Sequence, residues 1–396
     1  MFLKQKRSSF STGLKCAVSI SLACLVVFCI NCGSHKTGGW MTYRHDSARS
    51  GITTEGLNTP LALRWVFKPT HEPKPAWPKP GEEMERMHFD NAYHVTAAQG
   101  MVYFGSSVDN KVYALNARTG KLRWTFFTEG PVRYAPSIWR DRIYIGSDDG
   151  YVYCLKANSG KSIWKYRAGP SDEKLLGNGR MISLWPVRTS VLVDDGIVYF
   201  GAGVFPYEGV YICALNADDG TVVWKNDTIG DRAHELAFGG ISPQGYLIIS
   251  DNILYVPSGR AMPAAFGRKS GEFLYYLLPG AKVGGAWALL DQGSLIAGVD
   301  LSGEPAKRTY DEQTGKIKED MHAWFPGTDL VVTPDVSYAV TENGIFALDR
   351  EKYLIIRSSK KIALAEKRQK LRNLLSDLRK KISEVEIERE VKEGEE

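Results

Sequence analysis

Hydrophobic and polar residues alternate in short runs along most of this chain, with turns between the runs. Residues 101–127 show an apolar strand, a turn, a second strand, a glycine turn and a third strand that contains Trp124. The same order returns at 142–167 and at 197–227. Alternation with a period of two, bounded by Gly turns, is typical of half-buried antiparallel strands. The pattern predicts small β-sheets.

A further strand precedes two of these units, at 131–139 ("PVRYAPSIW") and at 186–193 ("PVRTSVLV"), which makes four strands per unit. Trp124 and Trp164 are 40 residues apart, whereas Trp164 and Trp224 are 60 apart. The surplus lies in the connection 169–183 and in the hairpin "GVFPYEG". Insertions confined to connections are typical of stacked repeats. Weaker copies follow at 245–277, 288–319 and 330–357.

Six units at this spacing predict an all-β fold, a β-propeller of four-stranded blades. The units either close as a small propeller, with residues 62–67 supplying a strand to the last blade, or belong to a seven- or eight-bladed ring that is incomplete. An open edge would expose unpaired strand groups and invite association.

The last 39 residues, 358–396, change character and have an a/d heptad seam, formed by Leu364, Leu371, Leu375, Leu378, Ile382 and Val385. This spacing predicts a long amphipathic, coiled-coil helix that packs on the propeller, on another copy or on a missing partner helix. The predicted divisions are 1–32 (export or anchor segment), 33–60 (linker), 61–357 (propeller) and 358–396 (helix). Reading the genomic DNA beyond the stop codon would show whether the chain is a truncated form of a longer protein.

The net charge of +5 is concentrated at the N-terminus, where Lys4, Lys6, Arg7 and Lys15 precede an apolar run from Cys16 to Ile30. Without these four the remainder is about neutral, so no electrostatic footprint for nucleic acid is present. A basic stretch before an apolar run of this length is typical of a secretory signal. We therefore predict an exported protein of the periplasm or cell envelope. Whether the segment is cleaved, lipidated or retained stays open.

Four of the six cysteines lie in or beside this segment. Cys32 stands where a lipoprotein cysteine could be, although Asn31 before it is not the usual small residue. Cys154 and Cys213 occupy adjacent positions of the aligned repeat, so their side chains leave opposite faces of a strand. Two buried thiols are favoured over a disulfide.

The eleven residues "ALNARTGKLRW" recur with small changes at 154–164 and 214–224. The Gly of each copy serves a tight turn that needs positive φ, and the Trp four residues later can cover the gap between blades. We assign a structural role at the blade seam to Gly120, Trp124, Gly160, Trp164, Gly220 and Trp224.

This stretch resembles the repeat of PQQ-like, or quinoprotein-type, β-propellers, strongly over 101–227 and moderately to 357. That resemblance implies one of two classes: quinone- and calcium-dependent dehydrogenases, or outer-membrane-assembly propeller lipoproteins that bind neither cofactor. A further resemblance, to long bacterial secreted propeller proteins, implies that blades can be interrupted by a helical segment.

Within the resemblance, the dehydrogenase class is disfavoured. The resembled enzymes have eight Trp-bearing blades, a vicinal cysteine pair and acidic calcium ligands. The chain shows three Trp in register, no Cys-Cys pair, and Asp pairs such as Asp148-Asp149 that precede Gly and fit hairpin turns. PQQ and calcium are therefore not expected, and no metal site is predicted.

Candidate ligand-binding residues lie where inner strands begin, because inner strands line a propeller's channel. Arg133 and Arg188 follow the same "PV" pair, and His94 holds the comparable place in the first unit. Converging guanidiniums would suit a small anion or an acidic glycan; the alternative is that they cap carbonyls or pair with Asp and Glu. The full candidate set is Asp90, His94, Arg133, Arg180, Trp185, Arg188 and Arg260, and no catalytic residue is assigned.

The sequence taken alone predicts a non-enzymatic scaffold of the cell envelope that binds proteins or a ligand, with self-association through the helix. A PQQ-dependent dehydrogenase-like enzyme, or a portion of a larger multidomain propeller protein, is the alternative.

Overall fold

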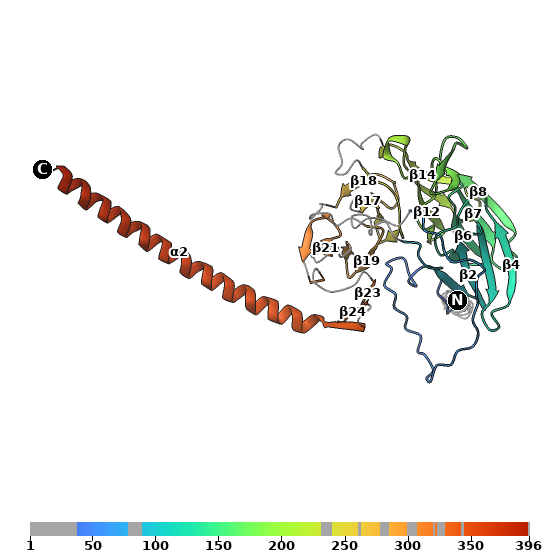
Figure 1. The fold of residues 1–396 in the computed structure, drawn as a ribbon, viewed down its shortest axis with the longest axis horizontal. Coiled ribbons are helices and arrows are strands. Elements are labelled where there is room, and N and C mark those ends of the chain that lie inside the picture. The colour runs from blue at the N-terminus through green and yellow to red at the C-terminus, as the bar shows by residue number, and fades with distance from the viewer. Residues whose placement is uncertain are drawn as a thin grey trace, which may run out of the picture. The chain divides into compact units, whose positions relative to one another are not determined.

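Apart from one two-stranded ribbon, the strands of the described residues group into six small antiparallel sheets that follow chain order, each made of consecutive strands (Figure 1). The structure is a computed structural model, and it describes residues 38–77, 89–230, 240–259, 263–277, 285–298, 307–319, 321–322, 329–341 and 344–394. The predicted segment 1–32, with Cys32, lies outside the described residues.

Five of the sheets have four strands, and the sixth has three. Sheet 1 contains β1 (Val95–Ala98), β2 (Met101–Ser106), β3 (Lys111–Asn116) and β4 (Leu122–Phe127); sheet 2 contains β5 (Ser137–Trp139), β6 (Arg142–Gly146), β7 (Tyr151–Lys156) and β8 (Ser162–Arg167). Sheet 3 contains β11 (Leu192–Asp194), β12 (Ile197–Ala202), β13 (Tyr211–Asn216) and β14 (Val222–Asn226); sheet 4 contains β15 (Ile248–Ile249), β16 (Ile253–Val256), β17 (Ala264–Gly267) and β18 (Phe273–Tyr276). Sheet 5 contains β19 (Ala288–Asp291), β20 (Ser294–Ala297), β21 (Arg308–Asp311) and β22 (Ile317–Glu319); sheet 6 contains β23 (Asp329–Val332), β24 (Val336–Thr341) and β25 (Gly344–Asp349).

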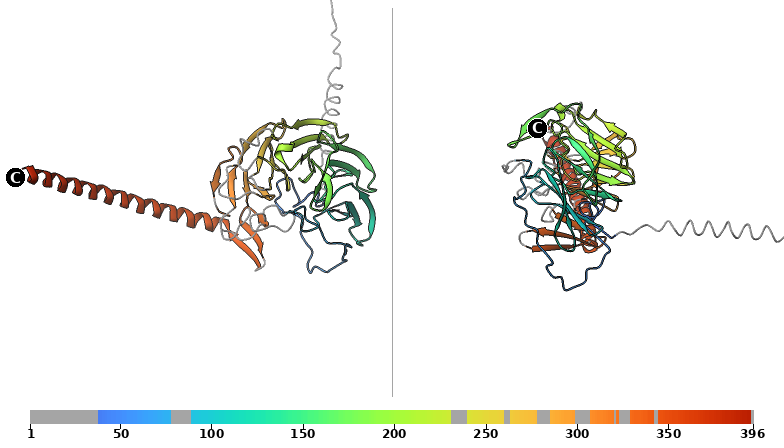
Figure 2. Two further views of the ribbon diagram at one scale, coloured as in Figure 1. Left: turned by 45° about the horizontal axis from the view of Figure 1, so that its top comes forward. Right: turned by 90° about the vertical axis from the view of Figure 1, so that its right-hand side faces the viewer.

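The sheets follow one another around an arc from sheet 1, in blue-green, to sheet 6, in orange-red (Figure 2). The hydrophobic core lies in layers between successive sheets. Between sheets 1 and 2, for example, Tyr103 and Val112 pack with Ile143 and Leu155. The predicted propeller of four-stranded blades is confirmed by this arrangement.

The surplus residues of the third unit lie in the predicted connections. They form a two-stranded ribbon, β9 (Lys174–Gly177) with β10 (Arg180–Ser183), and a short 3₁₀ turn, η2 (Pro206–Glu208). The repeated core of the unit is therefore unchanged by either insertion.

The tryptophans of the repeat lie at the seams between sheets. Trp124 of sheet 1 donates from Nε1 to Ala157 O of sheet 2 at 2.9 Å, and a Cβ on Gly160 would come within 2.5 Å of its ring. Trp164 and Trp224 make the same contacts with the next sheet, at Gly220 and Gly271. Glycine is needed at these turns both for their positive φ and for this close approach.

Tyr275 continues the series after the last tryptophan. Its hydroxyl donates to Glu312 O, and its ring lies against Gly315. The seam therefore does not end where the tryptophans end, because a tyrosine ring fills the same place at the boundary of sheets 4 and 5.

Residues 40–51, which we call the hub segment, lie along the innermost strands. Trp40 pairs with Ala97 of β1, and Met41 O accepts from Ile138 N of β5 at 2.8 Å. Further hydrogen bonds of the segment reach β11 (Ser47 to Asp194), β15 (Ser47 to Ile249), β19 (Ala48 to Leu290) and β23 (Arg44 to Leu330). One short stretch thus contacts all six sheets.

The sixth unit differs from the prediction at its end. A helix, α2 (Arg350–Gly394), begins directly after β25, so residues 353–357 are helical and do not form a fourth strand. In sheet 1, Asn116 is followed by a turn that ends at Gly120, whereas Tyr353 stands at the corresponding place after Asp349. Without Gly the chain does not turn back, and the Asp349 carboxylate accepts from Lys352 N at 2.9 Å, as at a helix N-cap.

One of the two predicted possibilities was that residues 62–67 supply a strand to the last blade. In the structure these residues form no strand with sheet 6. Trp65 instead lies against Gly120 of sheet 1. Cys154 and Cys213 are both buried and free, and they lie in the same layer between sheets 2 and 3 because they leave opposite faces of their own sheets.

Candidate functional site

A buried ion network occupies the start of the inner strands, where the sequence placed Arg133 and Arg188. Arg133 contacts Asp90 Oδ2 at 2.6 Å from Nη1 and Asp148 Oδ2 at 2.8 Å from Nε. Arg188 contacts the same Asp148 carboxylate from Nη2 at 3.1 Å and from Nε at 3.2 Å. All four residues are buried. The two guanidiniums therefore converge, as predicted, but on aspartates.

Asp148 is the residue that joins the two arginines, and sequence reasoning assigned it to a hairpin turn. Burial alone would raise the pKa of the Asp148 carboxyl, but Arg133 and Arg188 outweigh it and hold that pKa below its usual value. For Asp90 burial prevails over Arg133, and its pKa is raised. The sequence signal was weak, since an Asp before Asp-Gly is also what a turn requires.

A coil segment before sheet 1 covers this network. Lys74 O accepts from Arg133 Nη1 at 3.0 Å, and Ala76 N donates to Asp90 Oδ2 at 2.9 Å. The guanidinium of Arg188 lies 5.4 Å from the centre of the Trp77 ring. Because their charges and hydrogen bonds are satisfied within the chain, Arg133 and Arg188 hold the covering segment in place.

A second cluster of side chains lies next to the ion network and contains His94. The Nδ1 of His94 is hydrogen-bonded to the hydroxyl of Tyr246, which also accepts from Ala135 N at 3.2 Å. Tyr43 stacks on Tyr246 with ring centres 3.5 Å apart, and lies 4.9 Å from the His94 ring. Tyr246 is buried, whereas His94 and Tyr43 are half-buried. The imidazole is therefore the more accessible end of a hydrogen-bonded pair.

Arg49 of the hub segment supports this cluster. Its guanidinium lies 5.5 Å from the Tyr246 ring centre, and its hydrogen bonds end on carbonyl and hydroxyl oxygens, including Leu247 O at 2.8 Å and Thr42 Oγ1 at 2.8 Å. Burial lowers its pKa to about 10, which leaves it charged at neutral pH. Unlike Arg133 and Arg188, Arg49 makes no salt bridge within the described residues.

Burial raises the pKa of Tyr246 well above its ordinary value, so its phenol stays protonated. The donor and acceptor roles in the hydrogen bond between this phenol and His94 Nδ1 depend on the tautomer of the imidazole. In either tautomer the pair could take part in proton transfer.

The other predicted site residues do not join either cluster. Arg180, on the ribbon, donates to Asn110 Oδ1 at 2.9 Å. Trp185 donates to Glu208 O at 2.6 Å and packs against Gly169. Arg260 lies outside the described residues. Of the seven candidates, the structure brings Asp90, Arg133 and Arg188 together, and places His94 in the adjacent cluster.

Within the described residues, no group of three or more His, Cys, Asp and Glu side chains could hold a metal ion. The carboxylates of Asp90 and Asp148 are engaged by arginines. The Phe89 and Tyr134 rings stack on each other with their centres 5.1 Å apart. The expectation that the chain binds neither PQQ nor calcium stays a prediction.

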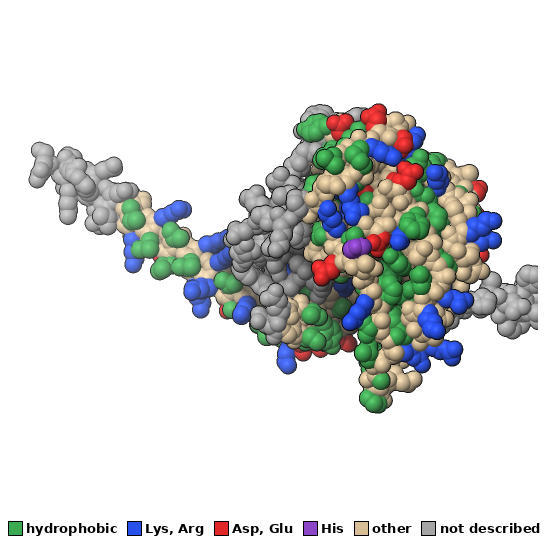
Figure 3. Space-filling view, turned by 45° about the vertical axis from the view of Figure 1, so that its right-hand side comes forward, with side chains coloured by type: hydrophobic (Ala, Val, Ile, Leu, Met, Phe, Trp, Pro, Cys, Tyr) green, Lys and Arg blue, Asp and Glu red, His purple; other side chains and the backbone are tan. Residues whose placement is uncertain are grey.

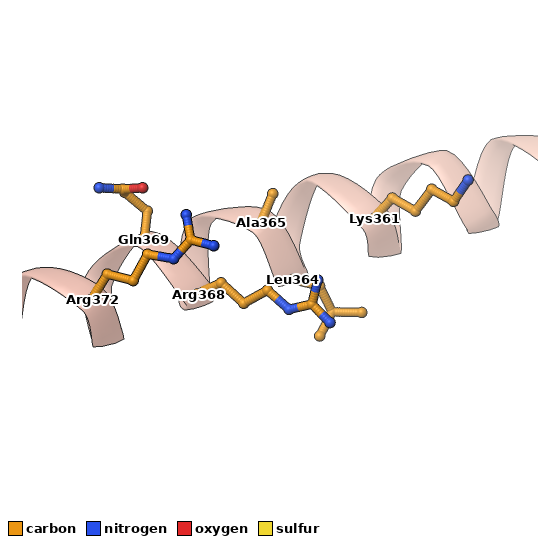
Figure 4. A pocket seen from close by; sticks show the side chains of 6 residues that line it. All are labelled: Lys361, Leu364, Ala365, Arg368, Gln369 and Arg372. Carbon is orange, nitrogen blue, oxygen red and sulfur yellow. The ribbon is translucent and has the colours of Figure 1, made fainter. Parts of the chain in front are cut away.

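A shallow depression on α2 is lined by Lys361, Leu364, Ala365, Arg368, Gln369 and Arg372 (Figure 4). All six side chains come from one helix, so the depression has no opposite wall in the described part of the chain. The propeller face in Figure 3 shows basic, acidic and hydrophobic side chains intermixed.

Comparison with known proteins identifies the family. The profile described as "Outer membrane protein assembly factor BamB", a PQQ-type repeat, matches residues 76–184 and 108–275, which together span half of the chain. The chain is a member of the PQQ-like propeller family. Within the described residues of this PQQ-like protein, no helix is both long and apolar enough to cross a bilayer.

Two curated relatives of this PQQ-like protein are enzymes. The tetrathionate hydrolase of Acidithiobacillus ferrooxidans is 24% identical over 256 residues, covering 62% of this chain and 47% of the relative. The quinoprotein ethanol dehydrogenase of Pseudomonas aeruginosa is 30% identical over 171 residues, 37% of this chain and 26% of the relative. The PQQ-like chain thus spans about half the length, or less, of these relatives. Among solved structures, BamB of Moraxella catarrhalis is 21% identical, with a TM-score of 0.45 over 64% of this chain and 71% of that chain.

These relatives overturn the prediction of a non-enzymatic scaffold. That prediction rested on marks of one group of dehydrogenases, such as a vicinal cysteine pair, which the PQQ-like chain lacks. Their absence argues against that group's particular site only, because enzymes on one fold can use different residues. The matches include a hydrolase as well as alcohol dehydrogenases.

Proposed function

We propose that this chain is an enzyme, or the blade-bearing part of one, of the quinoprotein-type propeller class. The observation that carries the proposal is the match to the tetrathionate hydrolase, which covers 62% of the chain and so extends beyond a single repeat. Because the chain spans 47% of that relative, the reaction of the whole relative is a proposal for this chain.

The geometry favours proton transfer at His94. The imidazole is half-buried and its Nδ1 is hydrogen-bonded to a buried phenol, which are the features of a positioned acid or base. Tyr43 forms a flat wall beside it. We assign His94 as the proton-transferring residue, with Tyr246 as a positioning residue.

The charge near this cluster favours an anionic substrate. Arg49 brings a positive charge that no described carboxylate neutralises by a salt bridge, and it lies behind the Tyr246 ring. A sulfur oxyanion such as tetrathionate would be attracted to that charge. Hydrolysis of such an anion is therefore the first candidate reaction.

Quinone-dependent oxidation of an alcohol is the second candidate, because several matching relatives carry that activity in their names. No step is assigned to calcium or to the quinone.

The experiment compares both reactions on the purified chain. One arm measures loss of tetrathionate by ion chromatography, and the other measures dye reduction by a primary alcohol with added quinone and Ca²⁺. We expect tetrathionate to be consumed, and His94→Gln to lower turnover by roughly 100-fold or more, the usual contribution of a general acid or base.

The matched control is His71→Gln, which changes an exposed histidine whose ring bonds to Asp109 rather than to Tyr246. It should leave turnover unchanged. Full activity of the His94 variant would exclude its role, and turnover of neither substrate would contradict the proposed reactions.

We also propose that the chain acts in the cell envelope, exported by the segment 1–32 and associated with the membrane through it. The family description, which refers to an outer-membrane assembly factor, supports an envelope location. As an enzyme, the chain could also bind envelope proteins, or an acidic glycan near the channel. Self-association through α2 is a further part of this proposal.

A further inference from the structure

We propose that residues 63–67, which we call the edge strand, are the fourth strand of a blade whose other three strands lie outside the described residues. The border between sheet 6 and sheet 1 would then bind at least one further sheet of the same repeat. This concerns an interaction surface and is independent of the proposed reaction.

The edge strand has the sequence of an outer strand. Residues 63–67 read Leu-Arg-Trp-Val-Phe, and residues 122–126 of β4 read Leu-Arg-Trp-Thr-Phe. Four of the five positions are identical. A segment before the first blade therefore repeats the strand that ends the first blade.

The edge strand also contacts sheet 1 as β4 contacts sheet 2. Trp65 donates from Nε1 to Ala117 O at 2.9 Å, and a Cβ on Gly120 would come within 2.7 Å of its ring. Trp124 bonds Ala157 O, also at 2.9 Å, and lies against Gly160 in the same way. The edge strand thus holds the position of an outer strand belonging to a sheet that precedes sheet 1.

A second aromatic residue of the edge strand repeats this equivalence. The ring centres of Phe67 and Tyr113 are 6.0 Å apart, and those of the equivalent pair, Phe126 and Tyr153, are 5.5 Å apart. Two side chains two residues apart therefore lie on sheet 1 in the manner of a strand of the repeat.

The backbone of the edge strand, however, has no sheet. In β4, Trp124 pairs with Ala114 of the third strand, whereas residues 61–69 are in no strand of the described chain. Leu63 is 82% exposed and Val66 is 61% exposed. The strand is docked by its aromatic face and lacks the third strand that would pair with its backbone.

Sheet 6 exposes the complementary surface. Tyr338 pairs with Ala347 in sheet 6 as Tyr103 pairs with Ala114 in sheet 1, so the two tyrosines are equivalent. Tyr103 is 1% exposed beneath sheet 2, but Tyr338 is 40% exposed. Ile345, at the place of the fully buried Val112, is 75% exposed. Sheet 6 therefore leaves open the face that sheet 1 buries against its neighbour.

One kind of sheet could contact both the edge strand and the open face of sheet 6. A sheet with three strands of this repeat could pair its third strand with the edge strand and bury the open face of sheet 6, as the existing sheets do with one another. The matched part of this chain is 47% of one relative and 26% of another, so both relatives are longer than this chain and leave room for such a sheet. Pairing of the edge strand with β25 of the same chain or of a second copy would be a different outcome.

The first test is hydrogen exchange on the purified full chain, with its mass measured in the same buffer. We expect the amides of residues 64–67 to exchange about 100-fold faster, or more, than those of β4, both in the full chain and in the monomer left after removal of residues 358–396, because only β4 is in a ladder. Equal protection in that monomer would mean that the ring closes on β25, and protection only in a dimer of the full chain would identify a second copy. Either result would overturn the proposal.

The second test supplies the missing strands. A copy of residues 131–160, which holds three strands and the Ser159-Gly160 turn, is inserted between Leu61 and Ala62. This places Leu63-Arg64-Trp65 after the turn as Ser162-Ile163-Trp164 follows it in sheet 2. We expect the edge-strand amides to slow about 100-fold, to the range of β4.

The matched control carries Val152→Pro within the inserted copy, which removes a ladder donor from its third strand. It should leave the edge strand in fast exchange. A protected insert beside an unprotected edge strand, or an insert that itself stays in fast exchange, would show that this border does not accept a sheet of the repeat.

Discussion

Asp148 illustrates how one buried carboxylate can hold a covering segment. It accepts hydrogen bonds from both Arg133 and Arg188, which in turn contact Lys74 O and the Trp77 ring. Two guanidiniums on a single carboxylate lower its pKa in spite of its burial. The residue therefore links the inner strands of sheets 2 and 3 to the coil above them.

Asp148→Asn should strongly destabilise the protein, because it leaves two buried guanidiniums with only the Asp90 carboxylate. We expect a loss of about 3–5 kcal/mol in the free energy of unfolding, the usual cost of breaking a buried ion pair. Urea denaturation measures it. The control Asp195→Asn makes the same chemical change in an exposed turn and should cost less than about 0.5 kcal/mol. Equal losses in the two variants would refute the role of the network.

His322 should make stability depend on pH. Its Nε2 is hydrogen-bonded to Ser337 Oγ at 2.8 Å, and burial, with Arg350 and Lys307 nearby, lowers its pKa from 6.5 to about 4. Between these values the unfolded chain binds a proton that the folded chain does not. The stability contribution is therefore complete above about pH 6.5 and is lost as the pH falls toward 4, by up to about 3 kcal/mol.

The free energy of unfolding of His322→Gln, measured from pH 4 to 7, should lose this slope. The exposed His71→Gln variant serves as the control and should keep it. If wild type and His322→Gln have parallel pH profiles, His322 is not the responsible group.

At the scale of elements, a single missing glycine converts a strand into a helix. β25 has the features of a third strand of the repeat, but after Asp349 no Gly allows a turn, and the carboxylate begins α2. The helix is exposed from residue 358 to 383, including the predicted seam from Leu364 to Ile382. The seam therefore does not pack on the propeller over that stretch.

Because this seam is apolar and exposed, we expect α2 to associate with a second copy. Light scattering should give a dimer for the full chain and a monomer after removal of residues 358–396. Leu371→Lys together with Leu375→Lys should also give a monomer, and Lys380→Gln, off the seam, should leave the dimer intact. A full chain that is monomeric at micromolar concentration would contradict the expectation.

At the scale of the whole molecule, the hub segment organises the sheets. It had been assigned to a linker, yet it bonds to the inner strand of each sheet, and Arg49 joins Leu247 O, Tyr43 O and Thr42 Oγ1 at 2.8 Å each. This brings residues far apart in sequence, such as Tyr43 and Tyr246, into a stack. The candidate site for proton transfer depends on that placement.

The repeat could be predicted from sequence because its signals are local. Alternating residues, a Gly at each turn and an aromatic residue four positions later determine each sheet and its contact with the next, so the propeller and the positions of Arg133, Arg188 and His94 followed from spacing. Asp148, Tyr246 and Arg49 could not be found in this way. Each also fits an ordinary turn or core position, and only packing around the centre brings them together.

The sequence by itself determined the sheets, the seams and the helix, since each depends on residues close in the chain. The tertiary structure alone decided which charges are neutralised, which imidazole is accessible and which edges stay open. These depend on contacts between segments separated by up to 286 residues, as from Arg44 to Leu330, and no local pattern encodes such contacts.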